Sequence, residues 1–271
     1  MIFYKTSDEI ELIRKSSLLV GKALAEVANV IRPGLTTAEL DAVAEQVIRD
    51  HGAVPSFKGY NGFPATLCVS VNEHVVHGIP GDRVIQDGDV VSVDCGAFLN
   101  GFHGDSAYSF LVGNVAEEVK HLAAVTKKGL ALGIEKSLSG NRVGDISHAI
   151  QWYCETKEGY GVVRELVGHG IGRALHEAPE IPNFGTKGRG PKLEVGMTIA
   201  IEPMINLGKR GVVQENDGWT IRTKDGKVSM HYEHTVAIGK DKADVLSSFE
   251  AIEAAVEKNA NLYRLEQVIE Y

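Results

Sequence analysis

The feature of this 271-residue chain that most constrains its fold is a repeated pattern of strand and carboxylate. Two segments, Gly88–Asp94 and Gly196–Glu202, each run from a glycine through alternating β-forming residues to an acidic residue six positions later. Asp105 and Glu233 each begin a further strand-like segment that ends at a glycine. The pattern equates the two terminal carboxylates and gives each half of the chain two acidic residues from neighbouring strands.

Helical segments come before the strands in both halves. Apolar residues recur at three- and four-residue steps between Thr6 and Ile31, and a capping box is predicted at Thr6. A second capping signature at Thr36 predicts a helix that stops near Gly52. Further helical patterns cover about residues 116–138 and 145–158. We therefore expect an α+β fold, with pseudo-repeats of about 1–115 and 116–271 in a single domain 1–271.

Asn100-Gly101 lies between two β-rich runs and is a strong signal for a two-residue hairpin turn. Such a turn pairs residues whose numbers sum to 201, which places Asp94 opposite Ala107. Asp105 then becomes the diagonal neighbour of Asp94 on the same face, about 7–8 Å away. Two carboxylates at that separation can close around two metal ions about 3.5–4 Å apart.

The sequence around Asp94 and Glu202 is apolar, since each carboxylate ends a run rich in valine, isoleucine or alanine. A single acidic residue on a strand is most often a solvated surface residue. Buried carboxylates without partners are costly, however, and few basic residues lie near these positions in the sequence. Metal ions are therefore the natural compensating charge, and an oxygen-rich donor set suits Mn, Fe, Co or Zn.

His169 lies in the glycine-rich segment Gly168–Gly172, and His176 follows seven residues later. A lone histidine is more often structural than a metal ligand. The segment superficially suggests a phosphate loop, but Arg173 stands where a dinucleotide fingerprint needs glycine, and no GK[ST] ending follows. The chain contains neither a GxSxG elbow nor an HExxH motif, which argues against a serine hydrolase and a zincin.

The charge and the cysteines restrict the class of protein further. A formal net charge of -8 at pH 7 argues against general binding to nucleic acid or to anionic membranes. The three cysteines lack CxxC spacing and predict neither a disulfide framework nor a zinc ribbon. Charged residues interrupt the apolar residues near the N-terminus, so we expect a cytoplasmic protein without a signal peptide.

Taken together, the acidic residues and histidines resemble those of type I methionine aminopeptidase, over essentially the whole chain. The resemblance rests on five residues in the order of that family's metal ligands, namely Asp94, Asp105, His169, Glu202 and Glu233. Two further histidines also match: His77 in Asn72–Pro80 and His176 in His169–Pro179. It implies the duplicated pita-bread fold of creatinase and the aminopeptidases, in which two pseudo-symmetric halves place helices outside a central antiparallel sheet. Only 33 positions separate His169 from Glu202, too few for the insertion that marks type II enzymes.

The resemblance also implies a reaction, namely removal of the initiator methionine from nascent proteins whose second residue is small. The five residues would hold two divalent metal ions (Co, Mn, Fe or Zn), with Asp94 bidentate on one ion and with Asp105 and Glu233 bridging. Glu202 would relay a proton, His176 would donate to the developing oxyanion, and His77 would hold the scissile amide.

A methionine pocket is implied by the same resemblance. His77 and His176 would contact the substrate, and the pocket positions are occupied by Tyr60, Phe63, Cys68 and Trp219. Ordinary core packing is the alternative interpretation of these apolar residues. Phe57 stands where bacterial relatives often have cysteine, and Leu175 stands where they often have phenylalanine.

Several alternatives stay open on the sequence alone. A Xaa-Pro peptidase of the same fold shares the five ligands but normally carries a large N-terminal domain, whereas this chain begins almost directly at its first helix. An inactive relative that binds peptides in its cleft should have lost ligands, and a purely structural metal site should be closed. We expect a monomer that acts on nascent polypeptide N-termini, with contact at the ribosome left open.

Overall fold

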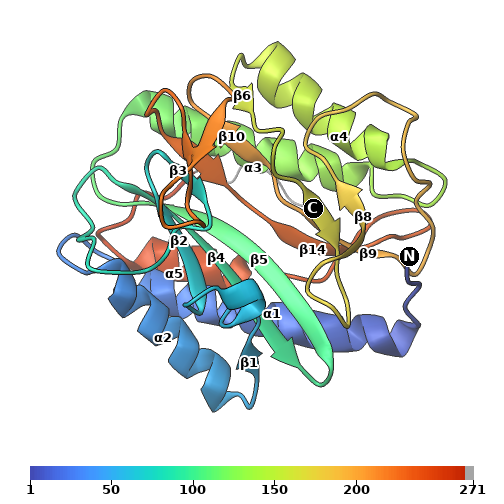
Figure 1. Cartoon of the computed structure of the whole chain (residues 1–271), viewed down its shortest axis with the longest axis horizontal. Coiled ribbons are helices and arrows are strands. Elements are labelled where there is room, and N and C mark those ends of the chain that lie inside the picture. The colour runs from blue at the N-terminus through green and yellow to red at the C-terminus, as the bar shows by residue number, and fades with distance from the viewer. Residues whose placement is uncertain (266–271) are drawn as a thin grey trace.

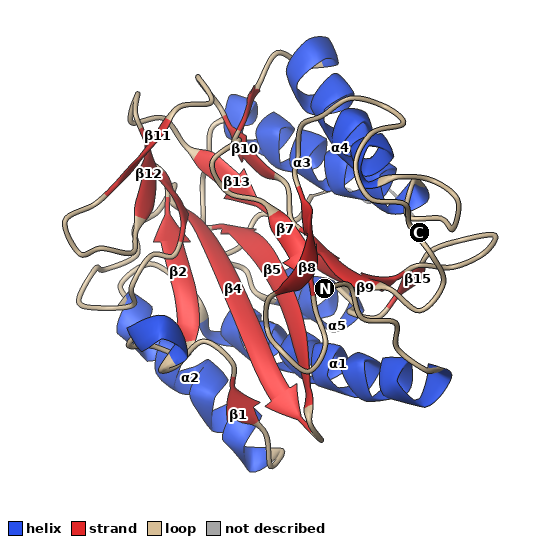
Figure 2. Cartoon of the chain, turned by 45° about the vertical axis from the view of Figure 1, so that its right-hand side comes forward, coloured by secondary structure: helices blue, strands red, loops and turns tan. Residues whose placement is uncertain are grey.

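The computed structural model describes residues 1–265, so the end of the second predicted repeat, residues 266–271, lies outside the described part of the chain. Strands fill the middle of the molecule, and helices cover it on two sides (Figure 1). One group of helices lies over the first half, and the other lies over the second half (Figure 2). The first group is α1 (Ser7–Val30), α2 (Thr37–Asp50) and α5 (Glu250–Lys258), and the second is α3 (Glu117–Glu135) and α4 (Val143–Gln151).

Local side-chain contacts explain where the helices begin. The Thr6 hydroxyl accepts the Glu9 N–H at 3.3 Å, and the Glu9 carboxylate accepts the Thr6 N–H at 3.0 Å, so the first predicted capping box is confirmed. The box at Thr36 is confirmed in the same way. The helix α4 begins at Val143, before the predicted start at Asp145, because the Asp145 carboxylate accepts the Arg142 N–H from its first turn. A π-helical segment, Trp152–Lys157, continues it.

The predicted hairpin consists of β4 (Val90–Leu99) and β5 (Phe102–Leu111). Asn100 and Gly101 have φ of 54° and 85°, as a two-residue turn of this kind requires. Asp94 lies opposite Ala107, which confirms the predicted register. The expectation that Asp105 begins its strand is wrong, because the tight turn lets pairing start at Phe102 and leaves Asp105 inside β5.

Within residues 1–265, the expected antiparallel sheet is divided into four smaller sheets, and the strands paired in them run antiparallel. In the first half, β1 (Val54–Pro55) and β2 (Leu67–Val71) join the hairpin. The largest sheet of the second half contains β7 (Gly168–Gly170), β8 (Glu177–Ile181), β9 (Thr198–Ile201), β14 (His234–Ala237) and β15 (Asp244–Val245). The two remaining sheets are β6 (Gly161–Val162) with β10 (Met204–Asn206) and β13 (Ser229–His231), and β3 (His74–Val76) with β11 (Val212–Gln214) and β12 (Ile221–Thr223).

The second half repeats this antiparallel strand pair with a change of register and with a long connection between the two strands. Strands β9 and β14 pair so that His234 lies opposite Ile201. The next step of that register places Glu202 opposite Glu233, just beyond the paired ends. The carboxylates of the first half are diagonal neighbours instead, but each half supplies its two acidic residues from adjacent strands, as the repeated pattern predicts.

Hydrogen bonds between β5 and the segment 231–235 join the two halves. The Glu233 N–H donates to the Ala107 carbonyl at 3.0 Å, and the Ser106 hydroxyl donates to the Glu233 carbonyl at 2.8 Å. The Thr235 hydroxyl donates to the Asp105 carbonyl at 2.8 Å. These bonds set Asp105 and Glu233 side by side, although they come from different repeats.

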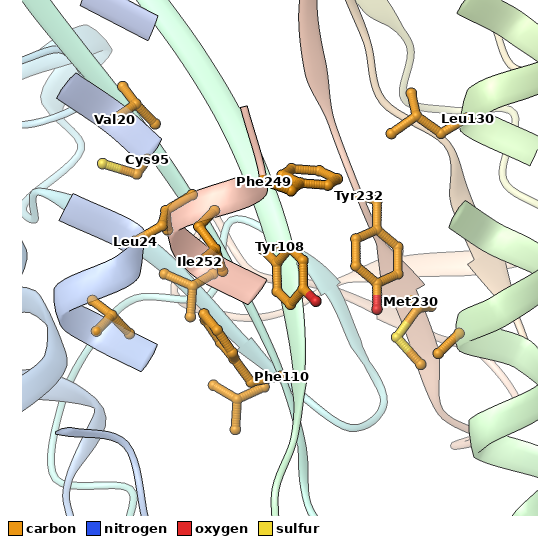
Figure 3. Close-up of a cluster of buried hydrophobic side chains, with 14 of the residues drawn as sticks. Val20, Leu24, Cys95, Tyr108, Phe110, Leu130, Met230, Tyr232, Phe249 and Ile252 are labelled. Carbon is orange, nitrogen blue, oxygen red and sulfur yellow. The ribbon is translucent and has the colours of Figure 1, made fainter. Parts of the chain in front are cut away.

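An aromatic cluster packs behind this seam, between the strands and the helices (Figure 3). Tyr108 meets Tyr232 and Phe249 edge-on, with ring centroids 5.2 and 5.1 Å apart. Such pairs contribute about 0.5–1.5 kcal/mol beyond the burial of their area. The cluster therefore holds the two halves together on the side facing away from the carboxylates.

The three cysteines, Cys68, Cys95 and Cys154, are buried and free. A search of the described helices finds none with the length and apolar character needed to span a bilayer.

We expect Gly104→Ala to destabilise the protein, because a Cβ at this position of β5 would collide with the α1 backbone at Ser16 and Ser17. Overpacking of this kind costs about 1–3 kcal/mol. The melting temperature should fall by about 2–4 °C for each kcal/mol. Gly81→Ala is the matched control, since a Cβ there meets open space; equal melting temperatures for the two variants would contradict this packing.

Candidate metal and substrate site

The residues predicted for the site line one cavity of about 280 Å³ where the two halves meet. All five predicted metal ligands, the two auxiliary histidines and the pocket residues contribute to its wall: Asp94, Asp105, His169, Glu202, Glu233, His77, His176, Tyr60, Phe63, Cys68 and Trp219. Phe57 and Leu175 line the same cavity. The structure therefore brings together residues that span the sequence from Phe57 to Glu233.

Three of the predicted ligands form the tightest group. Donor atoms of Asp105, His169 and Glu233 all lie within 4.8 Å of one another, and all three residues are buried. Asp94, from the next strand, and Glu202, at the end of β9, complete the acidic wall of the cavity. Oxygens Oδ1 of Asp94, Oδ1 of Asp105 and Oε1 of Glu233 are buried and accept no hydrogen bond from the described residues. Buried carboxylate oxygens that accept no hydrogen bond are suitable ligands for divalent cations.

Burial dominates the electrostatics of this wall. It raises the pKa of Asp94 to about 7 and the pKa of Glu202 to about 8. Burial, and after it the neighbouring carboxylates, also hold the pKa of Asp105 and Glu233 well above their ordinary values. Among residues 1–265, neither lysine nor arginine forms an ion pair with any of the four. A bound cation is the compensation that such a group needs.

The orientation of His169 fits its predicted role as a metal ligand. Its Nδ1 lies 2.9 Å from the Gly170 carbonyl, which must accept a hydrogen bond, so Nδ1 carries the proton and Nε2 keeps a free lone pair. That Nε2 lies 3.6 Å from Oε1 of Glu202. Burial lowers the pKa of His169 to about 3, so the ring stays neutral as metal binding requires.

His176 has a partner that the sequence did not suggest. Its Nδ1 lies 2.8 Å from the Tyr60 hydroxyl, and its ring meets that of His169 edge-on at 4.2 Å. When the Tyr60 hydroxyl donates to Nδ1, the proton of the neutral ring is on Nε2. Tyr60 is therefore placed to select the tautomer of His176 in addition to lining the pocket.

His77 follows β3 with a φ of 59°, in the left-handed region that a non-glycine residue rarely adopts. Burial lowers the pKa of His77 to about 4, so the ring is neutral at pH 7. The next residue, Gly78, is pressed against the backbone of Val69, which leaves no room for a side chain there. The backbone on both sides of His77 thus holds its ring at the cavity.

The apolar wall of the cavity is a small cluster separate from the main core, formed by Phe57, Phe63, Ala65, Cys68 and Leu175. Trp219 packs edge-on against Phe63, with centroids 5.1 Å apart. Phe57 lies against Gly96, where a Cβ would come within 2.8 Å of its ring. All of these residues except Ala65 and Gly96 line the same cavity as the carboxylates, so the cavity has a polar and an apolar side.

Sequence reasoning missed His231, which is buried beside the carboxylates. Its Nε2 lies 3.6 Å from Oε2 of Glu202. A signal for it was present, because His231 stands two residues before Glu233, and alternate residues of an extended segment share a face.

The comparisons with known proteins agree with this geometry. Residues 11–240 match metallopeptidase family M24. The chain is 53% identical over 247 residues to the methionine aminopeptidase of Clostridium perfringens, covering 91% of this chain and 99% of that protein. The crystal structure of the methionine aminopeptidase from Thermotoga maritima matches with a TM-score of 0.89 and 45% identity, covering 92% of this chain and 100% of that one.

The prolidase from Pyrococcus furiosus has a similar fold, with a TM-score of 0.74 and 25% identity, but the chain spans only 66% of that structure. A duplicated α+β fold with carboxylates and histidines around its cleft defines a metallopeptidase, and the chain belongs to metallopeptidase family M24. Within that family it is one of the type I methionine aminopeptidases, and the Xaa-Pro alternative is less supported.

We expect the metal-free protein to lose stability as pH rises from about 7 to 8.5. Asp94 and Glu202, with pKa values of about 7 and 8, hold protons in the folded state that an unfolded chain releases near pH 4, so the free energy of unfolding falls as they ionise. The buried histidines have lowered pKa values and oppose this trend only below about pH 6.5.

Thermal melts of chelator-treated protein across this range would measure the effect. Mn²⁺ should restore most stability at the upper end, where the ligands are ionised. Glu202→Gln, which removes one titrating group, should reduce the loss. A melting temperature that rises through this range in the metal-free wild type would contradict the proposed burial of these charges.

Proposed function

We propose that this chain removes the N-terminal methionine from nascent proteins and peptides whose second residue is small. The observation that carries the proposal is a cavity with two sides: a wall of carboxylates and histidines, and an apolar wall that includes Phe63, Cys68 and Trp219. One side suits a metal-assisted hydrolysis, and the other suits an unbranched apolar side chain such as methionine. The names of the chain's close relatives support the same substrate.

Divalent metal would be held by the four carboxylates and by Nε2 of His169, and we propose two ions drawn from Mn, Fe, Co and Zn. The unpartnered oxygens of Asp94, Asp105 and Glu233 fit this role. Bound ions of this kind acidify a coordinated water and polarise a substrate carbonyl.

The remaining steps fall to groups of the protein. Glu202, whose carboxylate lines the cavity beside the other ligands, would accept a proton and return it. His176, with its Nδ1 engaged by Tyr60, would direct its Nε2–H toward the oxyanion that develops on the first carbonyl. His77 would hold the scissile amide or its leaving nitrogen. Tyr60, Phe63, Cys68 and Trp219 would bind the methionine side chain.

We further propose that residues 1–271 act as one catalytic domain, with its repeats of about 1–115 and 116–271 closing on the substrate from two sides. The expected setting is the cytoplasm, where the three buried thiols would stay reduced. The enzyme would act as a monomer on the N-termini of nascent chains, including chains at the ribosome.

We expect Met-Ala-Ser to be cleaved much faster than Met-Leu-Ser, because a narrow cleft would exclude a large second side chain. Release of methionine from both peptides, measured with Mn, Fe, Co or Zn added to metal-free protein, tests this. Ala-Pro-Ser is the comparison for the Xaa-Pro alternative. Preferential cleavage of Ala-Pro-Ser would overturn the proposed function, and equal cleavage of the two methionyl peptides would remove the size restriction.

Asp94→Asn and His77→Ala should both abolish most activity, for different reasons. Metal that binds the folded state stabilises it by about 2.7 kcal/mol at a hundredfold excess over Kd. Asp94→Asn removes a charged ligand and should lose much of this metal-dependent rise in melting temperature. His77→Ala should keep that rise, while its rate falls by about 10²–10⁴.

Melting temperature and metal content of both variants, with and without added Mn²⁺, would separate these roles. The two proteins serve as controls for each other, since each carries a single substitution of a half-buried residue in the wall of the same cavity. A His77→Ala protein that binds less metal than wild type would make His77 a ligand, contrary to its proposed role.

A further inference from the structure

The Glu202 carboxylate lies between two imidazole rings, one on each oxygen. Nε2 of His169 is 3.6 Å from Oε1, and Nε2 of His231 is 3.6 Å from Oε2. His169 belongs to the predicted ligand set, but nothing in the proposed reaction uses His231. His231 is buried beside Glu202, the residue proposed to transfer a proton, so it is positioned to influence that carboxylate.

The backbone holds His231 in place from two directions. The backbone N–H of His231 donates to the Ser109 hydroxyl at 3.1 Å, and the same hydroxyl donates to the His231 carbonyl at 2.7 Å. These two hydrogen bonds fix the backbone of His231. Within β13 it pairs with Met204 of β10, two residues after Glu202. Met230 and Tyr232, on either side of it, point into the hydrophobic cluster (Figure 3). His231 therefore points the other way, toward the carboxylates.

The side chain of His231 is 2% exposed, and its Nε2 has no hydrogen-bond partner in the part of the chain that the structure describes. A neutral imidazole carries one N–H, and a ring nitrogen that faces a carboxylate favours the tautomer with the proton on that nitrogen. Buried polar groups are nearly always paired, so this N–H needs an acceptor. Oxygen Oε2 of Glu202 is the acceptor that the geometry offers.

A role as metal ligand is less suited to His231 than to His169. The group of donor atoms that lie within 4.8 Å of one another contains Asp105, His169 and Glu233 but not His231. The rings also differ in their second nitrogen, because Nδ1 of His169 is turned to the Gly170 carbonyl and so leaves Nε2 unprotonated. The two imidazoles that flank Glu202 thus present opposite chemistry: a lone pair on one side and a donor on the other.

We propose that His231 is a positioning residue whose Nε2–H donates to Oε2 of Glu202 and turns Oε1 toward the metal ligands. This inference rests on the proposed function in one respect, namely that Glu202 is both a ligand and the proton relay. The small movement that shortens the 3.6 Å separation to a hydrogen bond would lock the rotamer of Glu202. One oxygen would then serve the metal side while the other is held by the protein.

Three variants test this assignment. His231→Met removes the donor and keeps an unbranched side chain of similar reach, whereas His231→Gln keeps an N–H donor near the place of Nε2. Loss of an outer hydrogen bond to a metal ligand typically costs about 10–100-fold in affinity or activity. We expect His231→Met to lose this much kcat and Mn²⁺ affinity with little change in KM, and His231→Gln to restore both. Met230→Leu is the control, since that neighbour faces the core.

Mn²⁺ affinity and stoichiometry, measured by calorimetric titration, give a readout independent of activity. Unchanged Mn²⁺ affinity and kcat in His231→Met would overturn the proposal. So would the loss of one Mn²⁺ per chain in both His231 variants, because His231 would then be a ligand. If His231→Met does not fold, His231→Asn replaces it, since that amide is too short to reach Glu202.

The wild type in the same experiment separates the two hypotheses. Failure of wild-type protein to release methionine from Met-Ala-Ser would refute the proposed function. The Mn²⁺ affinities of the His231 variants would still decide whether His231 holds Glu202.

Discussion

Mutual repulsion among four closely spaced carboxylates, two of them buried and two half-buried, is the constraint on which the rest of the structure depends. Asp94, Asp105, Glu202 and Glu233 line one cavity, and burial raises the pKa of each. Charges placed this close in an apolar surrounding are stable only when a cation or protons neutralise them. The duplicated fold makes the arrangement feasible, because each half contributes only two of the four and the seam between β5 and residues 231–235 brings the pairs together.

Hydrogen bonds to Nδ1 determine which ring nitrogen carries the proton in His169 and in His176. The Gly170 carbonyl occupies Nδ1 of His169, and the Tyr60 hydroxyl occupies Nδ1 of His176. The two partners have opposite effects, since the carbonyl can only accept, whereas the hydroxyl can donate. One ring is thereby suited to bind metal and the other to donate to substrate, although their centroids are 4.2 Å apart. The chemical difference between the rings comes from these partners and from nothing in the rings themselves.

Sequence reasoning succeeded where the physics is local. The Asn100-Gly101 turn determines the hairpin register, because a two-residue loop permits one pairing, and the capping boxes at Thr6 and Thr36 depend on contacts within four residues. The start of α4 was wrong by a short distance, since Asp145 could be either a first residue or a capping acceptor. The division of the described strands into four sheets depends on long-range pairing that no local pattern contains. The position of His231 beside Glu202 depends on the pairing of β10 with β13 within the second half, and its alternation with Glu233 is the one local signal for it.

The seam between the halves also has a consequence for how the chain reaches its native state. Its hydrogen bonds join residues 127 and 130 positions apart, as in Ser106 with Glu233 and Thr235 with Asp105. Closing loops of this size costs little at equilibrium, since each doubling of length adds only about 0.6 kcal/mol. Folding rate is more sensitive, because contacts between distant residues form late and slowly. Either repeat can gain its helices early, but the proposed ligand set is complete only after the last long-range contacts have formed. Metal affinity should therefore be the final property that a refolding chain acquires.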